Sequence, residues 1–131
     1  MKESILQNLK KYNHNFQLEG KNKIRVKLAL NLDVLIEVSE DKLKFESQLV
    51  AWNPLSGALE TSLKKFVKAT FFWMLVISII YFAFASIYFD LSILLYNLAI
   101  LIGSLGYISF VGSYFFITYE SFKTNVMLWL K

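Results

Sequence analysis

The chain has 131 residues, 56% of them hydrophobic and 17% aromatic, with 14 Lys and Arg residues against 10 Asp and Glu residues, a net charge of +4. The apolar and aromatic shares lie well above those of an ordinary soluble domain. Because the chain contains no cysteine, disulfides, thiolate chemistry and cysteine-bound metals are excluded.

The charges are concentrated in the first half. Residues 1–68 carry twelve of the fourteen basic and eight of the ten acidic residues. Thirteen of the fourteen cations are Lys, and Arg25 alone is Arg, which argues against a site built on bidentate anion recognition. No amino-terminal secretory signal is expected, because the first long apolar run follows this charged segment.

A short helix and a sheet are predicted for residues 1–57, an α+β domain on the cytoplasmic side. Apolar residues recur at helical spacing from Ser4, a candidate cap, to Tyr12, and the helix is expected to stop at Asn13-His14-Asn15. From Ile24 to Val38 every even position is apolar, whereas odd positions carry Arg25, Lys27, Asn31, Asp33 and Glu37, which is the alternation of a half-buried strand. A strand of that length would span about 50 Å, so a bend or bulge is predicted near Ala29 to Asn31.

Two hairpins would complete a three-stranded antiparallel sheet, and each register can be predicted. The second hairpin, turning at Glu40-Asp41, should pair Val38 with Leu43, Glu37 with Lys44, Ile36 with Phe45 and Leu32 with Leu49. The first, turning at Gly20 to Lys23, should pair Leu18 with Val26 and Glu19 with Arg25. Both registers place apolar side chains opposite apolar side chains and pair side chains of opposite charge. A domain of about 60 residues buries little core, so a homo-oligomer is expected, with an open strand edge available for it.

The segment around Trp52, Pro54 and Gly57 should end the sheet and redirect the chain. One interpretation is an interfacial elbow with Trp52 anchored among lipid headgroups; the other is a mechanical coupling between sheet and membrane. A helix is predicted from Ala58 onward, with residues 58–68 as a juxtamembrane coupling helix continuous with the first span.

Residues 69–119 form a run of 51 residues with a single formal charge, Asp90. A span needs about 20 apolar residues, so this run predicts a transmembrane hairpin with spans at 69–89 and 92–118 and a turn at Phe89-Asp90-Leu91. Residues 120–131 are predicted to be a cytoplasmic tail.

Orientation follows from the flanking charges. The predicted turn contains no lysine. Lysines precede the first span, at Lys64, Lys65 and Lys68, and follow the second, at Lys123 and Lys131. The positive-inside rule then places both termini in the cytoplasm. The aromatic residues support the two predicted membrane boundaries. Trp73 and Trp129 lie near the cytoplasmic ends of the spans, and Tyr88 and Phe89 lie near the outer turn.

The second predicted span has two faces. One carries small residues suited to close helix packing, interrupted by Phe110: Ser92, Ala99, Gly103, Gly106 and Ser113. Asn97 and Ser104 lie on the other, where they would line a pore interior. In the alternative, Asn97 sits near the outer interface and Ser104 bonds its own helix backbone.

No arrangement of acid, base, nucleophile or metal ligands predicts an enzyme, and no cofactor or metal is expected. His14 is isolated, and the carboxylates fall on the polar face of the sheet. That face also carries the candidate ligand-binding residues Lys21, Lys23, Arg25, Lys27 and Lys44. They would bind an anion such as a nucleotide, a short single-stranded nucleic acid or lipid headgroups; the alternative is a solvated face of balanced ion pairs.

The arrangement resembles the small two-span membrane effectors of bacterial anti-phage signalling, such as Hailong-type effectors. The resemblance is of architecture: Ile24 to Val38 as sensor sheet, Lys64 to Lys68 as coupler and Ala69 to Tyr119 as hairpin. It implies an oligomer that opens a pore when its cytoplasmic domain binds a nucleotide or oligonucleotide signal.

The function predicted first is therefore an oligomeric inner-membrane ion channel or membrane-perturbing effector gated from the cytoplasm, in antiviral defence. The second is a membrane-anchored adaptor whose sheet recruits a soluble partner protein. The third is a holin-like lysis protein.

Overall fold

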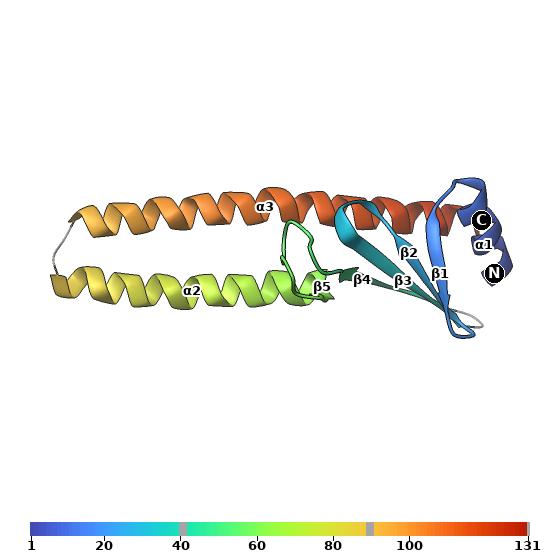
Figure 1. The fold of residues 1–131 in the computed structure, drawn as a ribbon, viewed down its shortest axis with the longest axis horizontal. Helices are drawn as coiled ribbons and strands as arrows, with labels where there is room; N and C mark the ends of the chain where they lie inside the picture. The colour runs from blue at the N-terminus through green and yellow to red at the C-terminus, as the bar shows by residue number, and fades with distance from the viewer. Residues whose placement is uncertain (40–41, 89–90, 131) are drawn as a thin grey trace.

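A small sheet domain sits at one end of a long two-helix hairpin. The computed structural model describes residues 1–39, 42–88 and 91–130. In order, these form α1 (Lys2–Lys11), β1 (Asn15–Glu19), β2 (Lys23–Lys27), the 3-10 turn η1 (Ala29–Asn31), β3 (Leu32–Val38), β4 (Leu43–Leu49), β5 (Thr61–Ser62), α2 (Leu63–Tyr88) and α3 (Leu91–Leu128). Figure 1 shows α2 and α3 side by side, with α3 running on past the start of α2 along the sheet to α1.

The described strands form one five-stranded antiparallel sheet in chain order, not the predicted three-stranded one. The single strand expected from Ile24 to Val38 is wrong, because the chain reverses completely at η1, where Leu30 and Asn31 have positive φ of 56° and 59°. Strands β2 and β3 therefore pair with each other, so that Ile24 lies opposite Ile36 and Val26 opposite Val34. Reversal about residue 30 sets even positions opposite even positions, so a hairpin and a straight strand give the same alternation.

The register of the β3–β4 hairpin is confirmed for all four predicted pairs, although the turn residues Glu40 and Asp41 lie outside the described residues. The register of the β1–β2 hairpin is wrong by two residues: Leu18 pairs with Ile24, and Glu19 pairs with Lys23. A tighter turn, with Gly20 at φ +76°, causes the shift. A two-residue shift keeps every side chain on its predicted face.

The first helix begins earlier than predicted. It starts at Lys2 with Met1 at the cap position and no capping side chain, so Ser4 is not the cap. The Ser4 hydroxyl instead donates to the carbonyl of Trp129 at 3.5 Å. Ile5 and Leu9 on this helix are fully buried. They pack with the even-numbered residues of β2 and β3 in the main core.

The carboxyl-terminal part of α3 completes that core. Residues 120–131, predicted to be a tail, are helical to Leu128 and supply Phe122 and Val126 to the cluster beneath the sheet. About two helical turns before Phe122, toward the hairpin, Phe115 is fully buried in a second cluster with Leu32, Leu49, Leu55 and Leu63. The sheet thus rests on α3 itself.

The helix predicted from Ala58 begins at Leu63 instead. Before it, β5 pairs with the end of β4, Leu49 with Thr61 and Gln48 with Ser62. The Ser62 hydroxyl then accepts a hydrogen bond from the backbone N–H of Lys65 at 3.3 Å, which starts the helix. Both α2 and α3 are long and apolar enough to cross a membrane, with windows of mean hydropathy 2.1 and 1.9.

Candidate functional site

The predicted cationic face of the sheet exists, but each cation lies beside an acid. Lys23, Glu37 and Lys44 form one row across β2, β3 and β4. The Lys23 ammonium lies 3.8 Å from the Glu37 carboxylate. Lys27 lies opposite Asp33. The charges therefore alternate across the face and weaken its field.

Arg25 is held between two carboxylates. Its Nε lies 2.7 Å from Glu19 Oε1, and its Nη1 lies 3.6 Å from Asp33 Oδ2. Asp33 is only 3% exposed. Burial raises the pKa of its carboxyl above the usual value of 3.8, and the charge of Arg25 opposes that rise. Lys21 lies apart in the β1–β2 turn, where its carbonyl accepts a bond from Lys2 Nζ. Four of the five predicted ligand-binding residues thus share a face of the sheet, Lys21 lies in the turn, and the five do not form a concentrated anion site.

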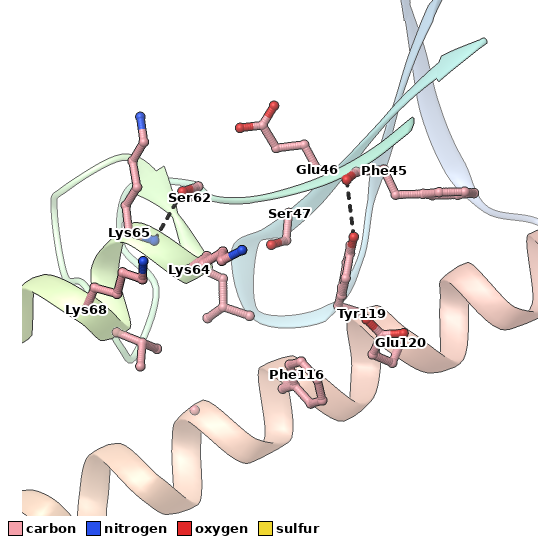
Figure 2. Close-up of a pocket in the computed structure, with 13 residues that line it drawn as sticks. Phe45, Glu46, Ser47, Ser62, Lys64, Lys65, Lys68, Phe116, Tyr119 and Glu120 are labelled. Carbon is pink, nitrogen blue, oxygen red and sulfur yellow. Dashed lines mark hydrogen bonds between the residues drawn. The ribbon is translucent and has the colours of Figure 1, made fainter. Parts of the chain in front are cut away.

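A different cluster of lysines lines a cleft of about 820 Å³, which we call the lysine cleft. Its walls come from β4 and β5, the first turns of α2 and the middle of α3. Figure 2 shows the residues of α2 on one side and those of α3 on the other. Its charged members are Lys64, Lys65, Lys68, Glu46 and Glu120.

The positive charge of the lysine cleft exceeds the negative charge. Glu120 is already bound by Lys123, at 3.2 Å across one helical turn. The first turn of α2 contains no acidic residue and two lysines, Lys64 and Lys65. The amino end of a helix is itself electropositive, so these lysines add to the helix dipole.

The lysine cleft continues into a second hollow of about 510 Å³ between α2 and α3, which we call the apolar groove. The two share Val67, Gly112 and Phe116. Further along, the groove is lined by Phe71 of α2 and Ile108 of α3 among other apolar groups. The two adjacent hollows therefore form an amphipathic cavity along the hairpin, with lysines at the end of the lysine cleft and apolar side chains at the end of the apolar groove.

The segment predicted as an elbow is a closed loop organised by Asn53. The Asn53 Oδ1 accepts bonds from the backbone N–H groups of Leu55 at 2.9 Å and Ser56 at 2.8 Å. Its Nδ2 donates to the carbonyl of Val50 at 2.7 Å and to the Ser56 hydroxyl at 2.6 Å. Gly57, expected to act as a free joint, is tied by its carbonyl to the N–H of Trp52 at 2.6 Å.

This loop also touches α3. The hydroxyl of Tyr107 donates to the carbonyl of Pro54 at 2.7 Å, inside the range predicted as the second span. Trp52 is 81% exposed beside that contact. The loop therefore connects the sheet to α3, in addition to the connection through α2.

The small residues of α3 do not pack within the hairpin. An added Cβ at Gly103 or Gly106 would meet no atom within 4 Å in the described structure. Ala99 and Ser92 are exposed, and Ser113 lines the apolar groove.

Asn97 and Ser104 are partly buried on the other side of α3. The Ser104 hydroxyl donates to the carbonyl of Ile100 in its own helix at 2.7 Å, as the alternative interpretation expects. The buried Asn97 Nδ2 has no hydrogen-bond partner in the described part of the chain.

The sequence interpretation treated Lys64, Lys65 and Lys68 as an orientation signal and as part of a coupling segment, and it missed their cleft. Their spacing of three and four residues, which sets them on neighbouring helical positions, was the available signal. The walls from β4 and α3 depend on the tertiary fold. The predicted outer turn, with the Tyr88 side chain, Phe89 and Asp90, lies outside the described residues.

Comparison with known proteins adds no relative. No protein-family model, curated protein or solved structure matches the chain. Among residues 1–39, 42–88 and 91–130, no group of three His, Asp or Glu side chains is placed to hold a metal ion.

Proposed function

We propose that this protein is an oligomeric channel or membrane-perturbing effector of the bacterial cell membrane, with both termini in the cytoplasm and control exerted by the sheet domain. One observation carries the proposal: α3 is a single helix from Leu91 to Leu128 whose first part is apolar and exposed and whose last part is the core of the sheet domain. Any movement of the sheet then shifts the membrane segment directly.

The exposed apolar side chains support insertion of the hairpin. Large residues face outward on all sides of α2 and α3, including Phe82 at 67% and Ile102 at 60% exposure. A helix that is hydrophobic all round requires burial in protein or lipid. The described chain supplies no protein layer to cover these side chains.

The aromatic residues suggest where the membrane ends on the cytoplasmic side. Trp73 on α2 and Trp52 and Tyr107 beside the loop are all exposed, and such residues favour the headgroup region. From Tyr107 back to Leu91, α3 would rise about 25 Å at 1.5 Å per residue. That length is close to the roughly 30 Å hydrocarbon core of a bilayer.

An oligomer is required because two helices cannot enclose a pore. The open surface at Gly103 and Gly106 offers close helix approach, and Asn97 offers an unpaired donor in the same segment. The exposed edge strand β1 offers backbone groups for pairing in the sheet domain. The resemblance to anti-phage effectors adds a nucleotide or oligonucleotide as the proposed signal.

The test combines assembly and conductance. Carbonate-washed membranes should retain the chain, mass photometry in nanodiscs should show one closed oligomer, and planar bilayers should show currents that change with added nucleotides. Gly103→Leu should reduce both oligomer and current, whereas Ala83→Leu, at another exposed hairpin position, should leave both unchanged. A monomer without current under all conditions contradicts the proposal.

A second candidate is an adaptor that recruits a soluble partner. The open edge of β1 and the exposed Trp52 favour it, because both present unpaired recognition groups outside the hairpin. Here Trp52→Ala and a proline at Gln17 would abolish partner capture while leaving membrane retention intact. Unchanged capture by both variants contradicts this candidate.

A further inference from the structure

We propose that the lysine cleft and the apolar groove together bind one anionic phospholipid of the cytoplasmic leaflet, with its phosphate at Lys64, Lys65 and Lys68 and an acyl chain between α2 and α3. The inference rests on the proposed membrane insertion and names a ligand that neither the channel nor the adaptor function requires.

The amino end of α2 explains the anionic headgroup. Helices normally place acids in their first turn, but here the first turn holds Lys64 and Lys65, and Lys68 follows within the same cleft. These ammonium groups and the helix dipole repel one another, and a phosphate placed among them relieves that repulsion. Of the two carboxylates in the cleft, Glu120 is bound by Lys123. Glu46 remains as the one carboxylate facing the site, which leaves a net positive charge.

The apolar groove explains why the ligand is a lipid and not a soluble anion. Val67, Gly112 and Phe116 line both hollows, so the cationic end opens directly onto apolar walls. The space at Gly112 is open, because an added Cβ there would meet no atom within 4 Å. A free phosphate or nucleotide would leave the groove unused, whereas an acyl chain would fill it.

The depth of the site also fits a lipid. Lys68 precedes Trp73 by five residues, which is about 7.5 Å along the helix. If Trp73 lies in the headgroup region, the lysines lie on its cytoplasmic side among the phosphates, and the far end of the groove, at Met74 and Leu105, reaches the start of the hydrocarbon core. A lipid so placed contacts both the hairpin and β4 of the sheet.

The experiment uses native mass spectrometry of the full chain released from detergent. Phosphatidylglycerol, phosphatidylcholine and soluble glycerol 3-phosphate are the three probes. The test variant is Lys64→Gln/Lys65→Gln/Lys68→Gln. Its control, Lys10→Gln/Lys11→Gln/Lys42→Gln, removes the same charge from exposed sites outside the cleft. Gly112→Leu blocks the passage without changing charge, and Ala83→Leu is its control.

The expected result is retention of phosphatidylglycerol over phosphatidylcholine. The cleft variant should lose about 10- to 100-fold in affinity, since each lysine near an anionic surface is worth about fivefold. Gly112→Leu should also weaken lipid binding, and both controls should match the wild type. Equal binding of the two lipids, or unchanged binding by the cleft variant, overturns the inference. Competition by glycerol 3-phosphate with no effect of Gly112→Leu overturns it in favour of a soluble anion.

Failure here is distinguishable from failure of the proposed function. A chain that stays in carbonate-washed membranes and conducts, but binds both lipids equally, contradicts only the lipid site. A chain recovered in the soluble fraction contradicts the membrane function as well.

Discussion

The two halves of α3 have different surroundings, because the sheet covers one face of the second half. In the first half, Tyr96 is 75% exposed and Phe110 is 80% exposed, whereas in the second half Phe115, Phe122 and Val126 are buried under the sheet. The change occurs within five residues, between Phe110 and Phe115. Both halves belong to one unbroken helix.

The comparison teaches that the apolar sequence of a helix does not show whether its side chains contact lipid or a protein core. A phenylalanine gains from leaving water whether it enters lipid or a protein core, so the apolar run up to residue 119 includes both the exposed first half of α3 and the buried Phe115. The sheet decides which residues of α3 meet protein. This is why the predicted second span extended to residue 118, past side chains that pack against β3 and β4.

The largest expected effect is at the point where the surroundings change. Phe115→Ala should cost about 3 to 5 kcal/mol, because it leaves a cavity in a fully buried cluster. Phe110→Ala, at an exposed position, should cost less than about 0.5 kcal/mol. Urea unfolding in detergent, followed by circular dichroism, measures both. Equal costs would show that the two halves share the same surroundings.

Asn53→Ala tests the loop that joins the sheet to α3 at the same boundary. The variant removes the acceptor of the Leu55 and Ser56 N–H groups inside a buried loop, at a cost of about 2 to 3 kcal/mol. Asn22→Ala, in the exposed β1–β2 turn, is the control and should change little. Thermal unfolding measures the difference, and similar shifts for the two variants would contradict the structural role of Asn53.

Tyr107→Phe tests the contact between this loop and α3. Loss of the bond to the Pro54 carbonyl should cost about 1 kcal/mol. Tyr96→Phe, in the exposed half, should have no effect on stability. Hydrogen exchange of residues 50–60 should rise in the first variant only, and an unchanged rate would mean that the loop is held by the sheet alone.

The smallest effect is a dependence on pH that should appear only in the sheet half. Because the pKa of Asp33 is raised above 3.8, the folded protein binds this proton more tightly than the unfolded chain. Its ionisation therefore opposes folding, and stability should fall as the pH rises from 3.8 through the raised pKa. Unfolding from pH 3.5 to 7 should show this slope in the wild type and not in Asp33→Asn. An identical slope in the wild type and in Asp33→Asn would show that groups other than Asp33 cause the pH dependence.

Local patterns predicted the elements that depend on neighbours in sequence. The alternation of residues 24–38 correctly gave the buried face of the sheet, and the β3–β4 register followed from the predicted pairing of Val38 with Leu43 across a turn at Glu40-Asp41. The reversal at Ala29–Asn31 could not be predicted, because it needs non-glycine residues at positive φ that only the surrounding structure stabilises. The lysine cleft was missed for a related reason: four of its thirteen lining residues come from α3, more than 40 residues away from the lysines in the chain.

By itself, the sequence determined that an apolar hairpin follows a charged α+β segment and which face of each strand is buried, since both depend on periodicity and on runs of similar residues. The tertiary structure decided which part of α3 meets protein and which lysines surround a cleft. It also decided that Arg25 is occupied by carboxylates instead of free for a ligand. These properties depend on contacts between distant segments, and the free energy of such contacts is set by the whole fold.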